Sequence, residues 1–101
     1  MRTVLFTLVA SSLVGCANAG RADTILGLTG DADAGATLYA DNCASCHGVD
    51  GTGGTQEGIL GEEASEIAEI VLNGEDSMPS FADSLADQDI ADIIAWIEAQ
   101  G

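Results

Sequence analysis

The side chains best suited to chemistry fall within one short run, Cys43-Ala44-Ser45-Cys46-His47. On a helical turn, two cysteines separated by two residues can both form thioether bonds to one edge of a porphyrin. The histidine that follows then lies beneath the ring, and imidazole suits the role of an iron ligand there. The motif therefore predicts one covalently attached haem c, with Cys43 and Cys46 as attachment points and His47 as proximal ligand.

Other uses of this pair of cysteines fit the chain less well. A thioredoxin-like redox pair has the same spacing, but it belongs near a βαβ unit, which nothing in this sequence predicts. A structural zinc ion needs four ligands, and the mature chain would offer one histidine and only two or three cysteines, depending on whether Cys16 is kept. A chance match to the motif is expected in roughly one chain in a few thousand.

The opposite side of the iron has one strong candidate ligand, Met78. Met1 leaves with the predicted export signal, His47 is the only histidine, and the chain has no lysine. Pro79 holds the residue before it in an extended conformation, which suits a loop residue that supports a ligand. The alternative is an ordinary methionine that fills a gap in the core. Histidine with methionine raises the reduction potential and leaves no open coordination position, which favours electron transfer over oxygen chemistry.

Three helices are predicted to position these residues, over residues 32–42, 64–73 and 87–100. The last carries Ile90, Ile93, Ile94 and Ile97 on one face. Two glycine-marked loops separate the helices, and no run alternates clearly enough to predict a strand. The expected fold class is therefore all-α.

Single residues mark the ends and contacts of these helices. Asp31 suits the N-cap of the first helix, and Gly74 suits the end of the second. Gly35 inside the first helix costs about 1 kcal/mol relative to alanine, so we expect a close approach to its backbone. From Gly48 to Gly61, counting both ends, the chain has six glycines and no apolar period, which indicates a loop.

Residues 30 to 100 resemble small monohaem cytochromes c of the bacterial single-domain type. The shared pattern includes Gly35, Leu38-Tyr39, the Cys43-to-Gly48 run, Asn73-Gly74, Met78-Pro79-x-Phe81, Ile90 and Trp96-Ile97. The resemblance implies a cytochrome c fold, with three main helices wrapped around one haem and glycine-rich loops. It also implies that Met78 is the distal ligand.

The resemblance implies one further packing contact and shows one departure from the family pattern, and the apolar residues of the sequence supply candidates for the pocket wall. Gly35 and Tyr39 are expected to contact Ile93, Trp96 and Ile97 where the first and last helices cross. The haem pocket wall is expected to consist of apolar side chains from all parts of the domain, namely Leu38, Ile59, Leu60, Ile67, Val71, Phe81, Leu85, Ile93 and Ile97. The family's loop proline, whose carbonyl accepts the N–H of the proximal histidine, is missing here, so no partner of His47 is predicted.

The N-terminus has the features of an export signal. Arg2 precedes an apolar run, which fits a signal peptide over residues 1–15, and Leu13-Val14-Gly15-Cys16 resembles the bacterial lipobox, so Cys16 is the predicted lipidation site. The alternative is secretion with cleavage before Gly20, which would remove Cys16. Residues 16–30 are predicted to be a flexible tether, although Ile25 could pack on the domain, and residues 31–101 the cytochrome c domain.

The charge balance limits the partners. The sequence has 17 acidic residues and two cationic ones, a net charge of −15. Such a surface repels nucleic acid and favours basic partner proteins. We expect a periplasmic or envelope electron carrier, anchored to a membrane through Cys16, and not an enzyme. The alternatives are a haem-bearing subunit of a larger envelope oxidoreductase and a ligand-sensing haem protein with a labile Met78.

Overall fold

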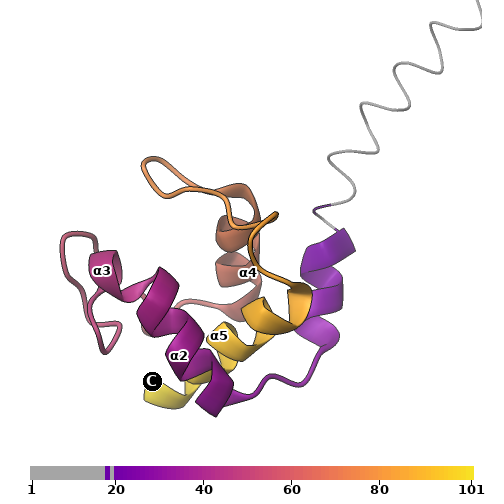
Figure 1. Cartoon of the computed structure of the whole chain (residues 1–101), viewed down its shortest axis with the longest axis horizontal. Helices are drawn as coiled ribbons and strands as arrows, with labels where there is room; N and C mark the ends of the chain where they lie inside the picture. The colour runs from indigo at the N-terminus through magenta and orange to yellow at the C-terminus, as the bar shows by residue number, and fades with distance from the viewer. Residues whose placement is uncertain (1–17, 19) are drawn as a thin grey trace, which may run out of the picture.

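The computed structural model describes residue 18 and residues 20–101. The helices labelled in Figure 1 are α2 (Ala32–Asn42), α3 (Ala44–His47), α4 (Ala64–Asn73) and α5 (Asp87–Gln100). Over the described residues there is no strand, only two isolated bridges between loop residues. The predicted all-α class and the three predicted helix ranges are confirmed.

Helix α2 packs closely against α5 (Figure 1). At the crossing, a Cβ atom on Gly35 would lie 1.9 Å from the carbonyl oxygen of Asp92, so only glycine allows the two backbones to come so close. Tyr39 stacks on Trp96 nearby, with ring centroids 4.3 Å apart. Aromatic pairs of this kind contribute about 0.5–1.5 kcal/mol beyond their buried area. The predicted contact of Gly35 and Tyr39 with the last helix is therefore confirmed.

The helix ends follow the residues that predicted them. The Asp31 carboxylate accepts hydrogen bonds from the backbone N–H groups of Asp33 and Ala34, at 3.0 and 3.3 Å, so it caps α2. Helix α4 stops at Gly74, whose φ of 76° suits a residue without a side chain. The apolar faces of α4 and α5 supply most of the buried core.

Residues 20–27 form a further helix that packs beside the start of α5 (Figure 1). Its Ile25 is 1% exposed, and Arg21 forms an ion pair with Asp87. A flexible tether was expected over residues 16–30, and within residues 20–27 the structure differs from it, because burial of Ile25 and the bonds of Arg21 fix this helix to the domain. The signal peptide predicted over residues 1–15, and Cys16, lie outside the described residues. No helix in the described part of the chain is long and apolar enough to cross a membrane.

Candidate functional site

An open cavity of about 540 Å³ lies between α3, α4, α5 and the loop before α5. Ligand and cofactor sites commonly have volumes of about 300–1,000 Å³ and mostly apolar walls. The apolar side chains that line this cavity are Ile59, Ile67, Ile70, Val71, Met78, Pro79, Phe81, Ile93 and Ile97. The cavity is therefore large and apolar enough to hold an organic cofactor.

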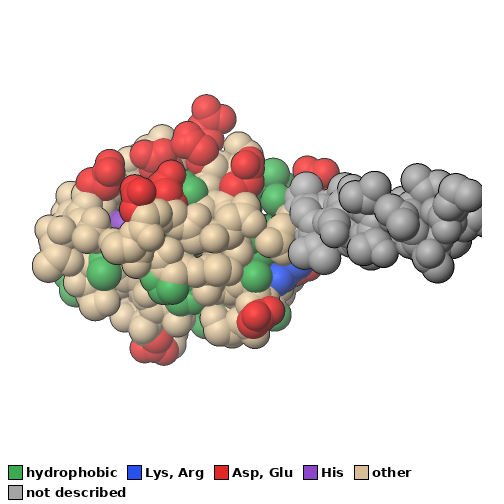
Figure 2. Space-filling model, turned by 90° about the horizontal axis from the view of Figure 1, so that it is seen from above, with side chains coloured by type: hydrophobic (Ala, Val, Ile, Leu, Met, Phe, Trp, Pro, Cys, Tyr) green, Lys and Arg blue, Asp and Glu red, His purple; other side chains and the backbone are tan. Residues whose placement is uncertain are grey.

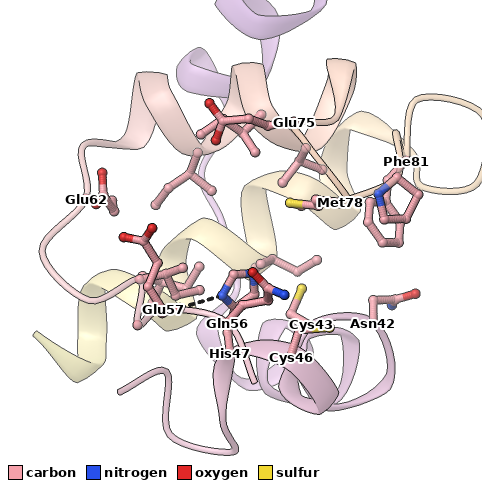
Figure 3. A pocket seen from close by; sticks show the side chains of 18 of the residues that line it. Asn42, Cys43, Cys46, His47, Gln56, Glu57, Glu62, Glu75, Met78 and Phe81 are labelled. Atoms are coloured by element: carbon pink, nitrogen blue, oxygen red, sulfur yellow. Dashed lines mark hydrogen bonds between the residues drawn. The ribbon is translucent and has the colours of Figure 1, made fainter. Parts of the chain in front are cut away.

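Both cysteines of the attachment motif line this cavity. Cys43 stands between α2 and α3 and Cys46 lies within α3, which gives them the helical turn that the spacing predicted. Both thiols are free, and the sulfur of Cys43 points into the cavity in Figure 3. Burial raises the pKa of the Cys43 thiol to about 11, and Cys46 adds to the shift. Before haem is attached, Cys43 is therefore a neutral thiol at pH 7.

His47 lies beside the cysteines with its ring fixed by one hydrogen bond. Its Nδ1 atom is 2.7 Å from the carbonyl oxygen of Glu57, the contact drawn as a dashed line in Figure 3. A carbonyl can only accept, so Nδ1 is the donor of this bond, and Nε2 is the ring nitrogen left to bind a metal. This bond supplies the partner of His47 that the sequence did not identify.

The loop that carries Glu57 folds back on the attachment motif through backbone contacts. The N–H of Gln56 donates to the carbonyl of Cys46 at 2.8 Å, and that of Gly53 to His47 at 2.8 Å. Gly58 lets the two sides of the loop meet, since a Cβ atom on it would lie 2.6 Å from the carbonyl oxygen of Thr52. The glycines of this loop therefore allow the Glu57 carbonyl to reach His47 without the loop proline expected from the resemblance.

Met78 lies on the loop between α4 and α5, on the side of the cavity opposite His47. Its sulfur points into the cavity in Figure 3. Backbone hydrogen bonds of 2.8 and 3.1 Å pair it with Glu75, and Phe81 ties the loop to α4 by donating to the carbonyl of Val71 at 2.8 Å. The structure therefore brings together four of the five predicted site residues, the exception being Cys16.

The predicted pocket wall is partly right. Six of its nine residues line the cavity: Ile59, Ile67, Val71, Phe81, Ile93 and Ile97. The other three do not, since Leu85 is buried in the core, Leu60 covers Gly51, and Leu38 packs at the edge of the core. Ile70 lines the cavity although it was left out, and its position one turn before Asn73 on the apolar face of α4 is the signal that could have found it.

Five acidic residues also line this largely apolar cavity. The acidic residues among its lining are Glu57, Glu62, Glu66, Glu75 and Asp76. Repulsion by Glu62, with smaller contributions from burial, Glu63 and Glu75, raises the pKa of Glu66 above its usual value. Figure 2 shows carboxylate side chains spread over one face of the molecule, with blue cationic atoms confined to a small area. We call the five acidic lining residues, Glu57, Glu62, Glu66, Glu75 and Asp76, the acidic rim.

The donor set fits a covalently held haem. Two free thiols, one imidazole with a fixed tautomer and one thioether sulfur all reach a single apolar cavity. These are the groups that attach haem c and bind its iron.

Comparison with known proteins agrees with this geometry. Residues 30–97 match the protein family described as cytochrome c oxidase, cbb3-type, subunit III. The chain belongs to the cytochrome c family. It carries covalently bound haem c.

The chain is also similar to individual proteins of two kinds. It is 33% identical to cytochrome c6 of a Picosynechococcus species, over 69% of this chain and 74% of that protein. It is 32% identical to the Cbb3-type cytochrome c oxidase subunit CcoP of Cereibacter sphaeroides, over 66% of this chain. It is 29% identical to the cytochrome c subunit of a quinone alcohol dehydrogenase of Gluconobacter oxydans, over 77% of this chain.

The two kinds of relative differ in how much of their length this chain spans. It spans only 27% of the oxidase subunit and 20% of the dehydrogenase subunit. No solved structure matches the chain.

Proposed function

We propose that this protein is a one-electron carrier of the bacterial cell envelope. In this proposal Cys43 and Cys46 attach the haem, and His47 and Met78 bind its iron from opposite sides. The observation that carries it is the placement of His47 and Met78 on facing walls of one apolar cavity with both thiols at its edge. Haem ligated in this way supplies reversible one-electron chemistry at a raised reduction potential.

The chain's own residues hold the site rather than react. The apolar wall excludes water, and the carbonyl of Glu57 fixes the His47 ring and makes it a better electron donor. Met78 fills the position that an exogenous ligand would need. We therefore propose that the protein is not an enzyme and does not sense small ligands.

The acidic rim supports a basic docking surface on the redox partner. Carboxylates that line the cavity would attract a positively charged partner to the side from which the cofactor is reached. Oxidation by a cationic cobalt complex should slow as salt is added, and oxidation by ferricyanide should speed up. Glu62→Gln should weaken both effects more than Asp23→Asn, an exposed change on the N-terminal helix.

We propose export and a lipid anchor at Cys16, with the domain held close to the membrane. The side chain of Asn18 already bonds to Asn73 at the end of α4, at 3.0 Å. Two residues span at most about 7 Å, so an anchor at Cys16 would leave little freedom. Palmitate labelling of Cys16 that resists hydroxylamine would support the anchor, and a mature mass beginning at Gly20 would refute it.

One experiment separates the carrier from its alternatives. The protein is matured in a host that attaches haem c, and the reduced form is exposed to carbon monoxide at neutral pH. The carrier assignment predicts a reversible one-electron titration and no carbon monoxide binding, whereas rapid binding at neutral pH would favour a ligand sensor. Cys43→Ala and Cys46→Ala should each leave the haem attached by one bond, and the double variant should release it on acid extraction.

A second candidate is a permanently docked subunit of a larger oxidoreductase. Two of the similar proteins are named as subunits, and the N-terminal helix and the turn after it expose Leu26 and Leu28. Purification of the native protein in a stable complex that resists high salt would favour this function. Isolation as a free monomer would favour the carrier.

A further inference from the structure

Arg21 makes three bonds, all to one short segment of the chain. It is the only lysine or arginine among the described residues. Its Nε donates to the Asp87 carboxylate at 2.8 Å, and its two terminal nitrogens donate to the carbonyl oxygens of Ala82 and Leu85, at 2.6 and 3.2 Å. The guanidinium thus uses its planar fork to bridge a turn and the first residue of α5.

That turn belongs to the loop that carries Met78. Three residues separate Met78 from Ala82, and the backbone N–H of Phe81 holds the same stretch to Val71 of α4 at 2.8 Å. Ser80 adds a second bond to α4, from its hydroxyl to the carbonyl of Leu72 at 2.5 Å. The loop is therefore fixed on one side by α4 and on the other by Arg21.

The contact between Arg21 and Asp87 is partly shielded from water. The side chains of Arg21 and Asp87 are 28% and 33% exposed. If the helix only covered apolar surface, Ala22 and Ile25 would be enough and no cation would be needed. Instead, Arg21, the one cation of the described residues, donates to two backbone carbonyls. Hydrogen bonds from a charged donor are roughly twice as strong as neutral ones.

We propose that Arg21 is a positioning residue that keeps the loop of residues 74–86 closed, so that the N-terminal helix acts as a strap on the Met78 side of the cavity. The proposal rests on the function proposed above, because it takes Met78 as the distal ligand. Arg21 touches neither Met78 nor the cavity and acts only through the segment from Ala82 to Asp87.

The test is imidazole binding to the oxidised, haem-loaded protein. Imidazole competes with Met78, so its apparent affinity rises in proportion to the fraction of molecules with an open loop. Arg21→Gln removes the charged fork and should raise that affinity roughly tenfold. Arg21→Lys keeps the charge without the fork and should give a smaller rise. Asp87→Asn removes the negative charge from one of the three acceptors, so it provides the same test if Arg21→Gln does not fold.

Ile25→Val is the matched control for a purely structural effect. It weakens the same helix without touching the three acceptors of Arg21. If Ile25→Val lowers stability as much as Arg21→Gln yet leaves imidazole affinity unchanged, the effect belongs to positioning. If both variants raise the affinity equally, or if neither Arg21→Gln nor Asp87→Asn raises it, the proposal is overturned.

Hydrogen exchange of the backbone amides over residues 80–86 gives a second readout that does not depend on the ligand. It should be faster in Arg21→Gln and unchanged in Ile25→Val. A wild-type protein without a sulfur-to-iron absorption band would overturn the assignment of Met78, and this proposal with it. A wild-type band together with unaltered exchange in Arg21→Gln would overturn the role of Arg21 alone.

Discussion

Replacing Gly35 by alanine tests whether the crossing of α2 and α5 is as close as described. The added Cβ atom would lie 1.9 Å from the carbonyl oxygen of Asp92, 2.5 Å from its carbonyl carbon and 3.1 Å from the backbone nitrogen of Ile93. All three are backbone atoms in the middle of a helix, so no side chain can rotate to make room. The two helices must separate by roughly 1 Å before the contact becomes tolerable.

The cost follows from what that separation disturbs. Tyr39 stacks on Trp96 across the same pair of helices, and Ile93 lines the cavity. Overpacking a core costs about 1–3 kcal/mol and occasionally more, and the loss of stacking adds to it. The better helix propensity of alanine returns only about 1 kcal/mol. We therefore expect Gly35→Ala to lower the free energy of unfolding by about 2 kcal/mol.

Guanidinium unfolding of the haem-loaded protein, followed by circular dichroism, measures this change. Gly27→Ala is the matched control, because a Cβ atom there meets nothing within 4 Å. The control should be neutral or stabilising by up to about 1 kcal/mol. Surface substitutions usually change the free energy of unfolding by less than about 0.5 kcal/mol. If Gly35→Ala changes it by no more than that, the close crossing of α2 and α5 is refuted.

Three further outcomes are expected. Gly58→Ala should push the loop off Thr52, weaken the bond from His47 to Glu57 and raise the reduction potential by roughly 40 mV in a voltammetric titration, the equivalent of about 1 kcal/mol; an unchanged potential would contradict this. Burial, with smaller contributions from Cys43 and Asp50, raises the pKa of Tyr39 to about 12. As the pH rises, the unfolded chain therefore loses this proton before the folded protein does. The free energy of unfolding should fall between about pH 10 and 12, by roughly 3 kcal/mol in all. Tyr39→Phe should remove that slope in denaturant titrations, and an identical slope in both proteins would refute the assignment. The melting temperature should rise with added NaCl, because screening reduces repulsion at a net charge of −15; a flat or falling melting temperature up to molar salt would count against it.

The helices were predictable because their residues carry local signals. Apolar spacing defined α4 and α5, Asp31 and Gly74 marked helix ends, and Gly35 indicated a close backbone contact before its partner was known. Such signals depend on neighbours within a few positions, so a single sequence is enough to read them.

The features that were missed depend on distant parts of the chain. The helix over residues 20–27 has no clear apolar period, and the acceptors of Arg21 lie more than sixty residues away. The partner of His47 is a backbone carbonyl, which every residue carries, so the identity of Glu57 could not mark it. Leu60 and Leu85 have the right chemistry for the pocket wall, but the path of the loops turns them elsewhere.

The most direct test of the account is the visible spectrum of the oxidised protein at the red edge, where sulfur bound to haem iron gives a weak absorption band. With His47 and Met78 on facing sides of the cavity, the wild-type protein should show this band. Met78→Ala should lose the band while the haem stays attached through Cys43 and Cys46. A wild-type protein without the band, or a Met78→Ala variant that retains it, would contradict the account.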